Sequence, residues 1–179
     1  MIEVTATVEQ LYRRIRDVPD FPKPGVVFKD ITPLLLDAAL FRRAVELMAA
    51  PFRQFAVSRV ISIESRGFLL GAPIALALEA GLVPMRKPGK LPGERGRVEY
   101  ALEYGTDALE MHRDAVGSAD RVLIVDDVLA TGGTAQAAAK LVRAHDAEVV
   151  GLTFLIELDF LRGREKLAGE RVEALLHYT

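Results

Sequence analysis

The sequence of 179 residues contains no cysteine, which excludes disulfide frameworks, thiolate metal sites and thiol nucleophiles. It has no uninterrupted apolar run near the roughly 20 residues that span a bilayer. No charge of one sign dominates, because 23 Lys and Arg stand beside 25 Asp and Glu. This balance gives no electrostatic argument for nucleic acid or an anionic membrane as a partner. The charged N-terminal segment lacks the apolar region of a secretion signal, and we expect a cytoplasmic protein.

What is present is typical of a globular protein. Half of the residues are hydrophobic and 27% are charged. The length predicts one domain, residues 1–179, with enough chain to bury a sizeable core. No internal repeat, low-complexity tract or linker divides the sequence.

Helix-like and strand-like segments alternate along the chain. Apolar residues at steps of three and four predict helices, and runs rich in β-branched residues predict strands. An irregular path is expected over residues 20–33, which contain three prolines. The alternation predicts an α/β fold with a mostly parallel sheet, and such sheets bind ligands beyond the carboxyl ends of their strands. Helices are expected over residues 7–17, 41–55 with a stop or kink near Pro51, 67–81 ending at Gly81, and 134–145, and strands over 57–65, 82–87, 122–127 and 147–158.

The most informative stretch is residues 121–139, RVLIVDDVLATGGTAQAAA. An apolar run leads into Asp126 and Asp127, and a Thr-Gly-Gly-Thr turn then opens a helix. Glycines let backbone N–H groups approach a ligand, threonines add hydroxyl donors, and the helix dipole favours negative charge. We therefore expect a phosphate cradle at residues 130–134, hereafter the cradle. It lacks both the Gly-Lys-Ser/Thr of a P-loop and the spacing of a Rossmann fingerprint.

The two aspartates need a partner that is neutral or cationic, because they would repel a phosphate bound beside them. A sugar diol is the obvious neutral partner, since carboxylates accept good hydrogen bonds from vicinal hydroxyls. A divalent cation is the other. A ligand with a phosphate, a ribose diol and a metal-bound pyrophosphate satisfies both features. The alternative is that the stretch is only a strand-to-helix connection with good turn residues.

Two more features favour an anionic ligand. Arg66 and Gly67 follow a predicted strand, where a guanidinium and a backbone amide can bind pyrophosphate; the less favoured alternative is that Arg66 is an ordinary surface residue after a strand. Residues 86–97, hereafter the basic segment, cannot build a core of their own. They predict a flexible flap that closes over an anion and excludes water, or otherwise an ordinary solvated hairpin. The basic residues of this segment are Arg86, Lys87, Lys90, Arg95 and Arg97.

The stretch VLIVDDVLATGGT resembles the phosphoribosyl pyrophosphate (PRPP) signature of type I phosphoribosyltransferases. The resemblance implies their fold, a mostly parallel central sheet flanked by helices, with a mobile flap and an N-terminal hood segment that forms a purine pocket. It also implies that Asp126 and Asp127 contact the ribose hydroxyls. The residues that would wrap the 5′-phosphate are Ala130, Thr131, Gly132, Gly133 and Thr134.

Three other stretches resemble the adenine phosphoribosyltransferase family. They are DFPKPGVVFKDITPLL at 20–35, hereafter the hood segment, ESRGFLLGAP at 64–73, and RKPGKLPG with EYALEYG within 86–105. The resemblance implies that Val27, Phe28 and Lys29 line the purine pocket, although Val27 and Phe28 alone would suit a core equally well. It also makes Glu103 the residue that handles the purine proton. Tyr100 and Tyr104 belong to the flap, where Glu99 departs from the Ser-Tyr or Thr-Tyr of several members.

The implied reaction is adenine plus PRPP giving AMP and pyrophosphate, with Arg66 and the flap cations on the pyrophosphate. Mg²⁺ is expected to bind mainly through PRPP, and no metal is expected to be held by the protein alone. The resemblance also implies a homodimer. Transfer to a 6-oxo purine such as hypoxanthine or xanthine remains open, because it depends on what Val27 presents to the base. A catalytically inactive PRPP-sensing regulator is disfavoured by the acidic net charge and by the absence of a DNA-binding module.

Overall fold

A five-stranded parallel sheet forms the centre of the computed structural model, which describes residues 7–101 and 106–179. Its strands lie in the order β4–β3–β7–β8–β9, and every neighbouring pair is parallel. The mostly parallel α/β architecture predicted from the sequence is therefore confirmed. The strands are β3 (Arg59–Ile63), β4 (Gly81–Met85), β7 (Arg121–Leu129), β8 (Glu148–Leu158) and β9 (Val172–Tyr178).

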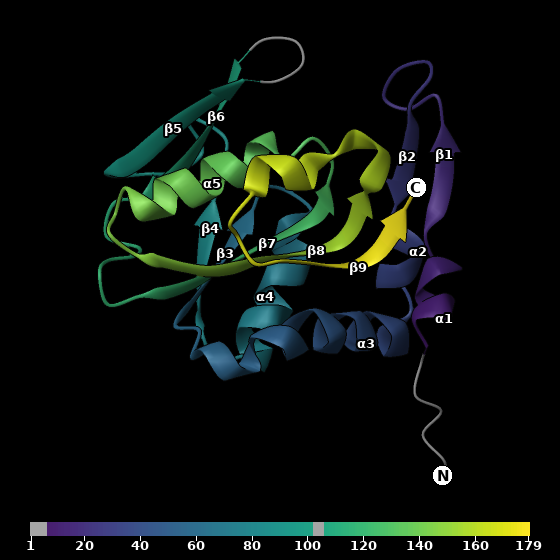
Figure 1. The fold of residues 1–179 in the computed structure, drawn as a ribbon, viewed down its shortest axis with the longest axis horizontal. Helices are drawn as coiled ribbons and strands as arrows, with labels where there is room; N and C mark the ends of the chain where they lie inside the picture. Colours follow the sequence, from purple (N-terminus) through teal and green to yellow (C-terminus); the bar gives the residue numbers. More distant parts are fainter. Residues whose placement is uncertain (1–6, 102–105) are drawn as a thin grey trace.

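Helices cover both faces of this sheet (Figure 1). Helix α5 (Gly133–Arg143) lies on one face, and α3 (Ala38–Ala49) and α4 (Gly67–Ala77) lie on the other. Successive residues of a strand point to opposite faces, and β7 follows this rule. Ile124 belongs to the core under α5, and Val125 to the core over α3 and α4. The apolar run before the aspartates is thus a strand buried on both faces.

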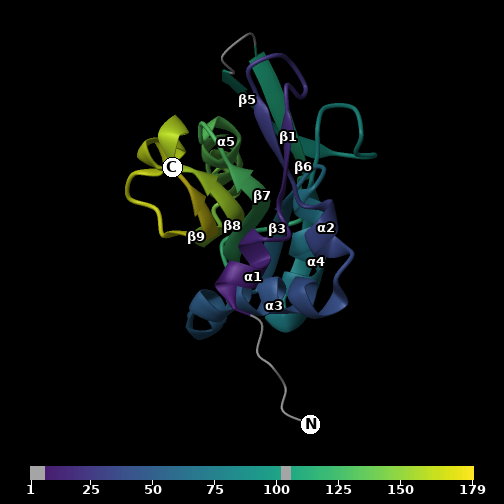
Figure 2. The same ribbon diagram turned by 90° about the vertical axis from the view of Figure 1, so that its right-hand side faces the viewer.

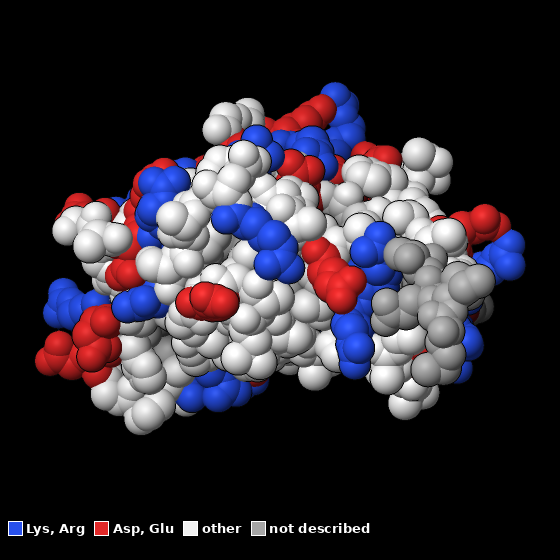
Figure 3. All heavy atoms as spheres, turned by 90° about the horizontal axis from the view of Figure 1, so that it is seen from below, with Lys and Arg blue, Asp and Glu red and all other residues white. Residues whose placement is uncertain are grey.

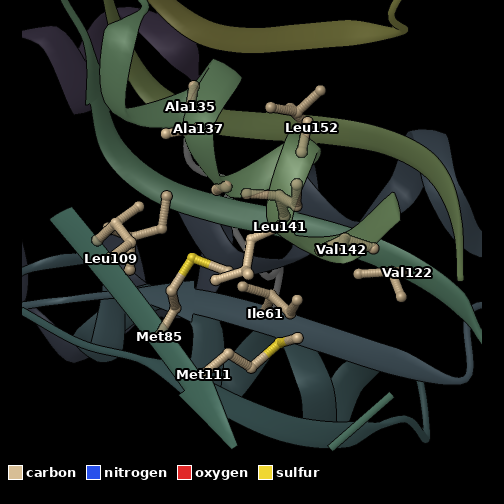
Figure 4. Close-up of a cluster of buried hydrophobic side chains, with 14 of the residues drawn as sticks. Ile61, Met85, Leu109, Met111, Val122, Ala135, Ala137, Leu141, Val142 and Leu152 are labelled. Atoms are coloured by element: carbon tan, nitrogen blue, oxygen red, sulfur yellow. The ribbon is translucent and has the colours of Figure 1, made fainter. Parts of the chain in front are cut away.

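The core under α5 joins the helix, the sheet and a separate hairpin. In Figure 4, Val142 of α5 lies beside Val122 of β7 and Leu109 of the hairpin lies beside Met85 of β4, and Leu141 and Ile61 belong to the same core. On the opposite face, α3, α4 and the short α1 (Val8–Tyr12) enclose a second core. These two cores fix the strand ends at which the polar residues lie.

Two antiparallel hairpins project on the side of the molecule where α5 lies (Figures 1 and 2). One pairs β1 (Arg16–Pro19) with β2 (Val27–Asp30) and contains most of the hood segment. The other pairs β5 (Arg95–Ala101) with β6 (Thr106–His112) and continues the basic segment. The short helical turns are α2 (Thr32–Leu35), η1 (Ala50–Phe55), η2 (Asp159–Leu161) and η3 (Gly163–Leu167).

Most predicted elements are present, but several boundaries differ. The N-terminal helix ends at Tyr12, because Arg16 to Pro19 pair with β2 across the chain. Helix α4 ends at Ala77 and Gly81 opens β4 instead, since Glu79 makes the turn with a φ of 56°. Strands β1, β2 and β9 were not predicted. The break at Pro51 is confirmed, because α3 ends at Ala49 and a 3₁₀ turn follows.

The surface gives no electrostatic sign of a polyanionic partner on the face seen from below in Figure 3, where basic and acidic side chains are interspersed. Within the described residues, no helix is both long enough and apolar enough to cross a membrane.

Candidate active site

The two aspartates lie within β7, which continues to Leu129 because Val128 and Leu129 pair with Ile156 and Glu157 of β8. Asp126 lines a small cavity beside α5, whereas Asp127 is only 6% exposed and pairs with Arg66. The pleat of the strand thus gives the neighbouring carboxylates different surroundings. The pair does not act as one flat acidic patch.

The cradle follows β7 and leads directly into α5. Gly132 caps the helix with a φ of 77°, a left-handed conformation that favours glycine, and no side chain caps the helix start. The first N–H groups of α5 are therefore available to an anion. The cavity of about 80 Å³ brings all five predicted cradle residues together with Asp126. It is lined by Asp126, Val128, Leu129, Ala130, Thr131, Gly132, Gly133, Thr134, Ala135 and Phe154.

Burial, and then the negative charge of Asp127, raise the pKa of Asp126 well above its ordinary value, although Asp126 keeps partial exposure. Burial also raises the pKa of Asp127, against the lowering effect of Arg66. Arg66 Nη2 lies 2.6 Å from Asp127 Oδ2, but the contact lacks the alignment of a hydrogen bond. Both carboxyl groups therefore have acceptor capacity that a hydroxyl donor would use.

Arg66 connects the aspartates to the hood segment. Besides Asp127, it contacts the ring of Phe28, with its guanidinium carbon 4.5 Å from the ring centroid, and it donates to the Lys29 carbonyl at 3.3 Å. The next residue, Gly67, allows a close approach, because a Cβ there would lie 2.9 Å from Asp126 Oδ1. Three segments far apart in the sequence therefore meet at Arg66.

The residues of the hood segment that were predicted to line the purine pocket are not part of the core. Val27 is exposed, and Phe28 is half-buried and belongs to neither hydrophobic cluster. Phe28 packs edge-on against Phe21, with ring centroids 5.1 Å apart. Lys29 pairs with Asp17 at 2.7 Å and lies 4.0 Å from the ring centroid of Tyr178. Phe28 is therefore an aromatic side chain with a face not committed to the core.

A buried carboxylate holds the beginning of the basic segment. Glu64 accepts hydrogen bonds from the side chains of Arg86 and Lys90 and from the backbone N–H of Lys87. Burial raises the pKa of Glu64, but the bonds from Lys90, Lys87 and Arg86 outweigh it and lower the pKa to about 2. Two of the predicted pyrophosphate-binding cations are thus already neutralised.

A second buried carboxylate holds the end of the basic segment. Glu110 is 3% exposed and accepts from the Gly89 N–H at 3.0 Å. It also pairs with Arg95 at 3.2 Å and lies 3.9 Å from Arg97. The basic segment is therefore tied to the sheet and to β6 by two acids, and its mobility as a flap stays a prediction.

Tyr100 links the second hairpin to the cradle. Its hydroxyl accepts from Lys87 at 2.8 Å and from Thr134 at 3.3 Å, and it lies 3.2 Å from Asp107. Burial lowers the pKa of Lys87, but Asp107 and Tyr100 outweigh burial and raise it. Burial raises the pKa of Asp107, but the bond from Lys87 outweighs it and lowers that pKa. Lys87 therefore stays cationic beside the cradle.

Glu103 and Tyr104, predicted for proton handling and for the flap, lie outside the described residues. Sequence reasoning gave no role to Glu64, Asp107 or Glu110. For Glu110 a signal existed, because a lone acid between Leu109 and Met111 interrupts an apolar run. Its partners could not be read from that run.

One cluster of possible metal ligands occurs within the described residues. Glu157, Asp159 and His177 each offer a ligand atom, and these atoms lie within 4.8 Å of one another. Neighbouring strands bring them together although the three histidines are scattered in the sequence. Arg164 already binds both oxygens of Glu157, at 3.1 and 2.6 Å, and the cluster does not line the cradle cavity.

Comparison with known proteins agrees with this geometry. The model of the phosphoribosyl transferase domain family matches residues 38–171, which include the sheet from β3 to β8 and the cradle. The adenine phosphoribosyltransferase of Myxococcus xanthus is 59% identical over 174 residues, covering 97% of this chain and 95% of that protein. That of Halothermothrix orenii is 53% identical over 167 residues, covering 93% and 98%.

Solved structures extend the likeness to three dimensions. The adenine phosphoribosyltransferase of Thermoanaerobacter pseudethanolicus superimposes with a TM-score of 0.94 at 50% identity, over 96% of this chain and 100% of that one. The Saccharomyces cerevisiae enzyme, crystallised with adenine and an imino-altritol bisphosphate, gives 0.89 at 38% identity, over 94% and 98%. The fold, the cradle and these likenesses agree. The chain belongs to the adenine phosphoribosyltransferase family.

Proposed function

We propose that the protein transfers the phosphoribosyl group of PRPP to adenine, giving AMP and pyrophosphate, as in purine salvage. One observation carries the proposal: a single cavity joins the Asp126 carboxylate to the whole cradle at the end of a parallel strand. A ribose 5-phosphate unit has a diol and a phosphate to match the two parts. The names of the relatives indicate that the acceptor base is adenine.

The ribose and its phosphate would be held without a cationic side chain. The free N–H groups at the start of α5 and the hydroxyls of Thr131 and Thr134 suit the 5′-phosphate. Asp126 and Asp127 suit the ribose hydroxyls. Burial disfavours the ionised form of each carboxyl group and raises its pKa, and a hydroxyl donor stabilises that ionised form. Holding the anomeric carbon in line with the base lowers the entropic part of the barrier.

The pyrophosphate leaves as the C1′–O bond breaks and the bond to the purine nitrogen forms. Arg66 and Gly67 beside the aspartates, and Lys87 near Thr134, are the groups we assign to it. Arg86 and Lys90 were also predicted to bind the pyrophosphate. Because both are paired with Glu64, we assign them an indirect role in that binding. Mg²⁺ bound to PRPP would neutralise the pyrophosphate oxygens, and the carboxylates of this site are ligands that it prefers.

The purine would stack on Phe28. This ring lies beside Arg66, which also binds the neighbouring Lys29 carbonyl. The exposed Val27 on the same strand supports the prediction that its backbone contacts the edge of the base. Glu103 remains our candidate for accepting the proton that the purine loses.

A homodimer is also proposed, on the evidence of α4. Leu76 is 80% exposed and Leu69 is 48% exposed, although the helix is apolar around its whole circumference. A helix of this kind is normally covered on every side. Sedimentation equilibrium would test the assembly, and a monomer at micromolar concentration would contradict it. A single domain and a cytoplasmic location stay predictions.

The test is to mix the purified protein with PRPP and Mg²⁺ and to offer adenine, hypoxanthine, guanine and xanthine separately. Nucleotide formation is followed for each base, with Glu103→Gln as the first variant. We expect AMP from adenine alone, and much slower formation by the variant. Turnover of a 6-oxo purine would contradict the assigned base. PRPP binding without turnover of any base would favour a PRPP-sensing protein instead.

A further inference from the structure

The backbone at Gly163 lies directly against the cradle, 30 residues along the chain from it. A Cβ on Gly163 would lie 2.0 Å from the Ala130 carbonyl oxygen and 2.9 Å from the Gly132 nitrogen. Conversely, a Cβ on Gly132 would lie 2.2 Å from the Gly163 carbonyl oxygen. Real Cβ atoms do not make contacts this short, so both positions must be glycine for the two backbones to meet. Gly163 is nevertheless not among the residues that line the cavity.

The turn that carries Gly163 is fixed to the edge of the sheet. Arg164 donates from Nε and Nη2 to both oxygens of Glu157, at the end of β8. Its Nη1 also donates to the Val172 carbonyl, at the start of β9, at 2.8 Å. Two parallel hydrogen bonds to one carboxylate fix the orientation of a guanidinium. The position of Gly163 is therefore set by β8 and β9, the last two strands at one edge of the sheet.

The same turn is fixed to α5. Gln136, in the first turn of that helix, donates to the Lys166 carbonyl at 2.9 Å. Leu167 is buried in the core under α5. The turn η3 (Gly163–Leu167), hereafter the brace, thus joins the end of β8, the start of β9, the helix and the cradle.

We propose that the brace is a positioning element for phosphate binding, in which Gly163 holds the Ala130–Gly132 backbone in the shape that accepts the 5′-phosphate of the substrate. This inference rests on the proposed function for the identity of that substrate. The brace touches neither phosphate nor base. It acts through the cradle, whose backbone N–H groups can bind an anion only if they point into the cavity.

The inference predicts a separation between the two substrates. A side chain at Gly163 displaces the cradle by pushing on Ala130 and Gly132. It leaves the hood untouched, because no contact joins the brace to Phe28 or Arg66 in the interactions of the described residues. The KM for PRPP should therefore rise while the KM for adenine stays unchanged.

The experiment compares Gly163→Ala with Gly117→Ala. Gly117 lies in a turn where a Cβ would meet nothing within 4 Å, so Gly117→Ala controls for adding a methyl group. For Gly163→Ala we expect the KM for PRPP and the Kd for ribose 5-phosphate, measured by calorimetry, to rise by about 100-fold. The KM for adenine should change less than about twofold, and Gly117→Ala should match the parent protein in all three.

Arg164→Lys provides a second variant, for the case in which Gly163→Ala does not fold. It keeps the charge but loses the paired bonds to Glu157, and we expect the Kd for ribose 5-phosphate to rise by about tenfold, with adenine again unaffected. Equal losses for both substrates would overturn the inference, as would unchanged binding of ribose 5-phosphate. If the parent protein binds ribose 5-phosphate but does not convert adenine, the proposed function fails and the binding comparison still decides on the brace.

Discussion

The cradle and the basic segment are both candidate anion sites, and they are built in opposite ways. The cradle contains no charged residue and relies on backbone N–H groups at the start of α5. The basic segment carries five cationic side chains, and buried or half-buried acids pair with each of them. The segment that looks more attractive to an anion is therefore the one whose charge is already balanced.

This difference concerns preorganisation. Fixed N–H dipoles need no rearrangement when an anion arrives. A cation paired with Glu64 or Glu110 must first leave that partner, which costs interaction energy. The same pairing keeps the cations from repelling one another when no anion is present. We infer that the cradle provides binding in the resting protein, and that the basic segment contributes only when the pyrophosphate competes with these acids.

The largest expected effect comes from breaking the cradle with Gly132→Ala. The variant places a Cβ 2.2 Å from the Gly163 carbonyl oxygen and forces alanine into a φ of 77°. Strain of roughly 1–3 kcal/mol is typical of such backbones, and the displacement should raise the KM for PRPP by about 100-fold or more. Steady-state kinetics with varied PRPP measure this.

Gly169→Ala is the control for that variant. Its φ is 89° but a Cβ there meets nothing within 4 Å, so it should lose stability without losing affinity for PRPP. If Gly169→Ala raised the KM for PRPP as much as Gly132→Ala does, backbone strain and not the contact with Gly163 would explain the loss.

Asp126→Asn should separate binding from stability. The variant keeps the acceptor oxygen but loses the charge that strengthens a bond to a sugar hydroxyl, so kcat/KM for PRPP should fall by about 10- to 100-fold. Because burial and Asp127 raise the pKa of Asp126 in the folded protein, its carboxyl group destabilises the fold once the pH rises above the ordinary value of 3.8. The unfolding free energy at pH 7 should therefore rise by about 1 kcal/mol, as measured in urea. A less stable variant would contradict this account.

Glu64→Gln tests the basic segment through pH. The pKa of Glu64 is lowered from 4.5 to about 2 in the folded protein, so its contribution is complete above pH 4.5 and is lost as the pH falls toward 2. Solvent screens the interaction, because the side chains of Arg86 and Lys90 are partly exposed. We therefore expect Glu64 to contribute about 1–2 kcal/mol to the free energy of unfolding. Urea unfolding between pH 2 and 6 should show this loss in the parent and not in the variant.

Glu94→Gln is the matched control, since the Glu94 side chain is 86% exposed. Its stability should follow that of the parent protein at every pH. An acid loss of the same size in Glu64→Gln would mean that other carboxyls produce it.

The smallest expected effect is that of Tyr100→Phe, which breaks the connection between the two regions. The variant loses the bonds that Lys87 and Thr134 donate to the hydroxyl while keeping the ring. One such bond contributes about 1 kcal/mol, so the KM for PRPP should change by roughly fivefold. No change in KM, with Lys87→Ala strongly impaired, would show that Lys87 acts without Tyr100.

How much could be predicted differs between the two regions. The backbone of the cradle was predicted from one contiguous stretch, because a strand, a glycine turn and a helix start are all local patterns. The partners of the basic segment come from β6 and from the end of β3, and no local pattern in residues 86–97 contains them. For the same reason the sequence predicted helix at Arg16, where pairing with β2 gives a strand.

The sequence by itself determined the parallel α/β class, the passage from strand through glycine turn to helix around residues 130–134, and the family, since each depends on the order of residues along a short stretch. The tertiary structure decided that Asp126 faces the cradle while Asp127 pairs with Arg66, that Glu64 and Glu110 balance the basic segment, and that Gly163 supports the cradle. These outcomes depend on the strand pleat and on contacts between segments distant in the chain. Neither is encoded in any single local pattern, because the energy of such a contact exists only once both partners are in place.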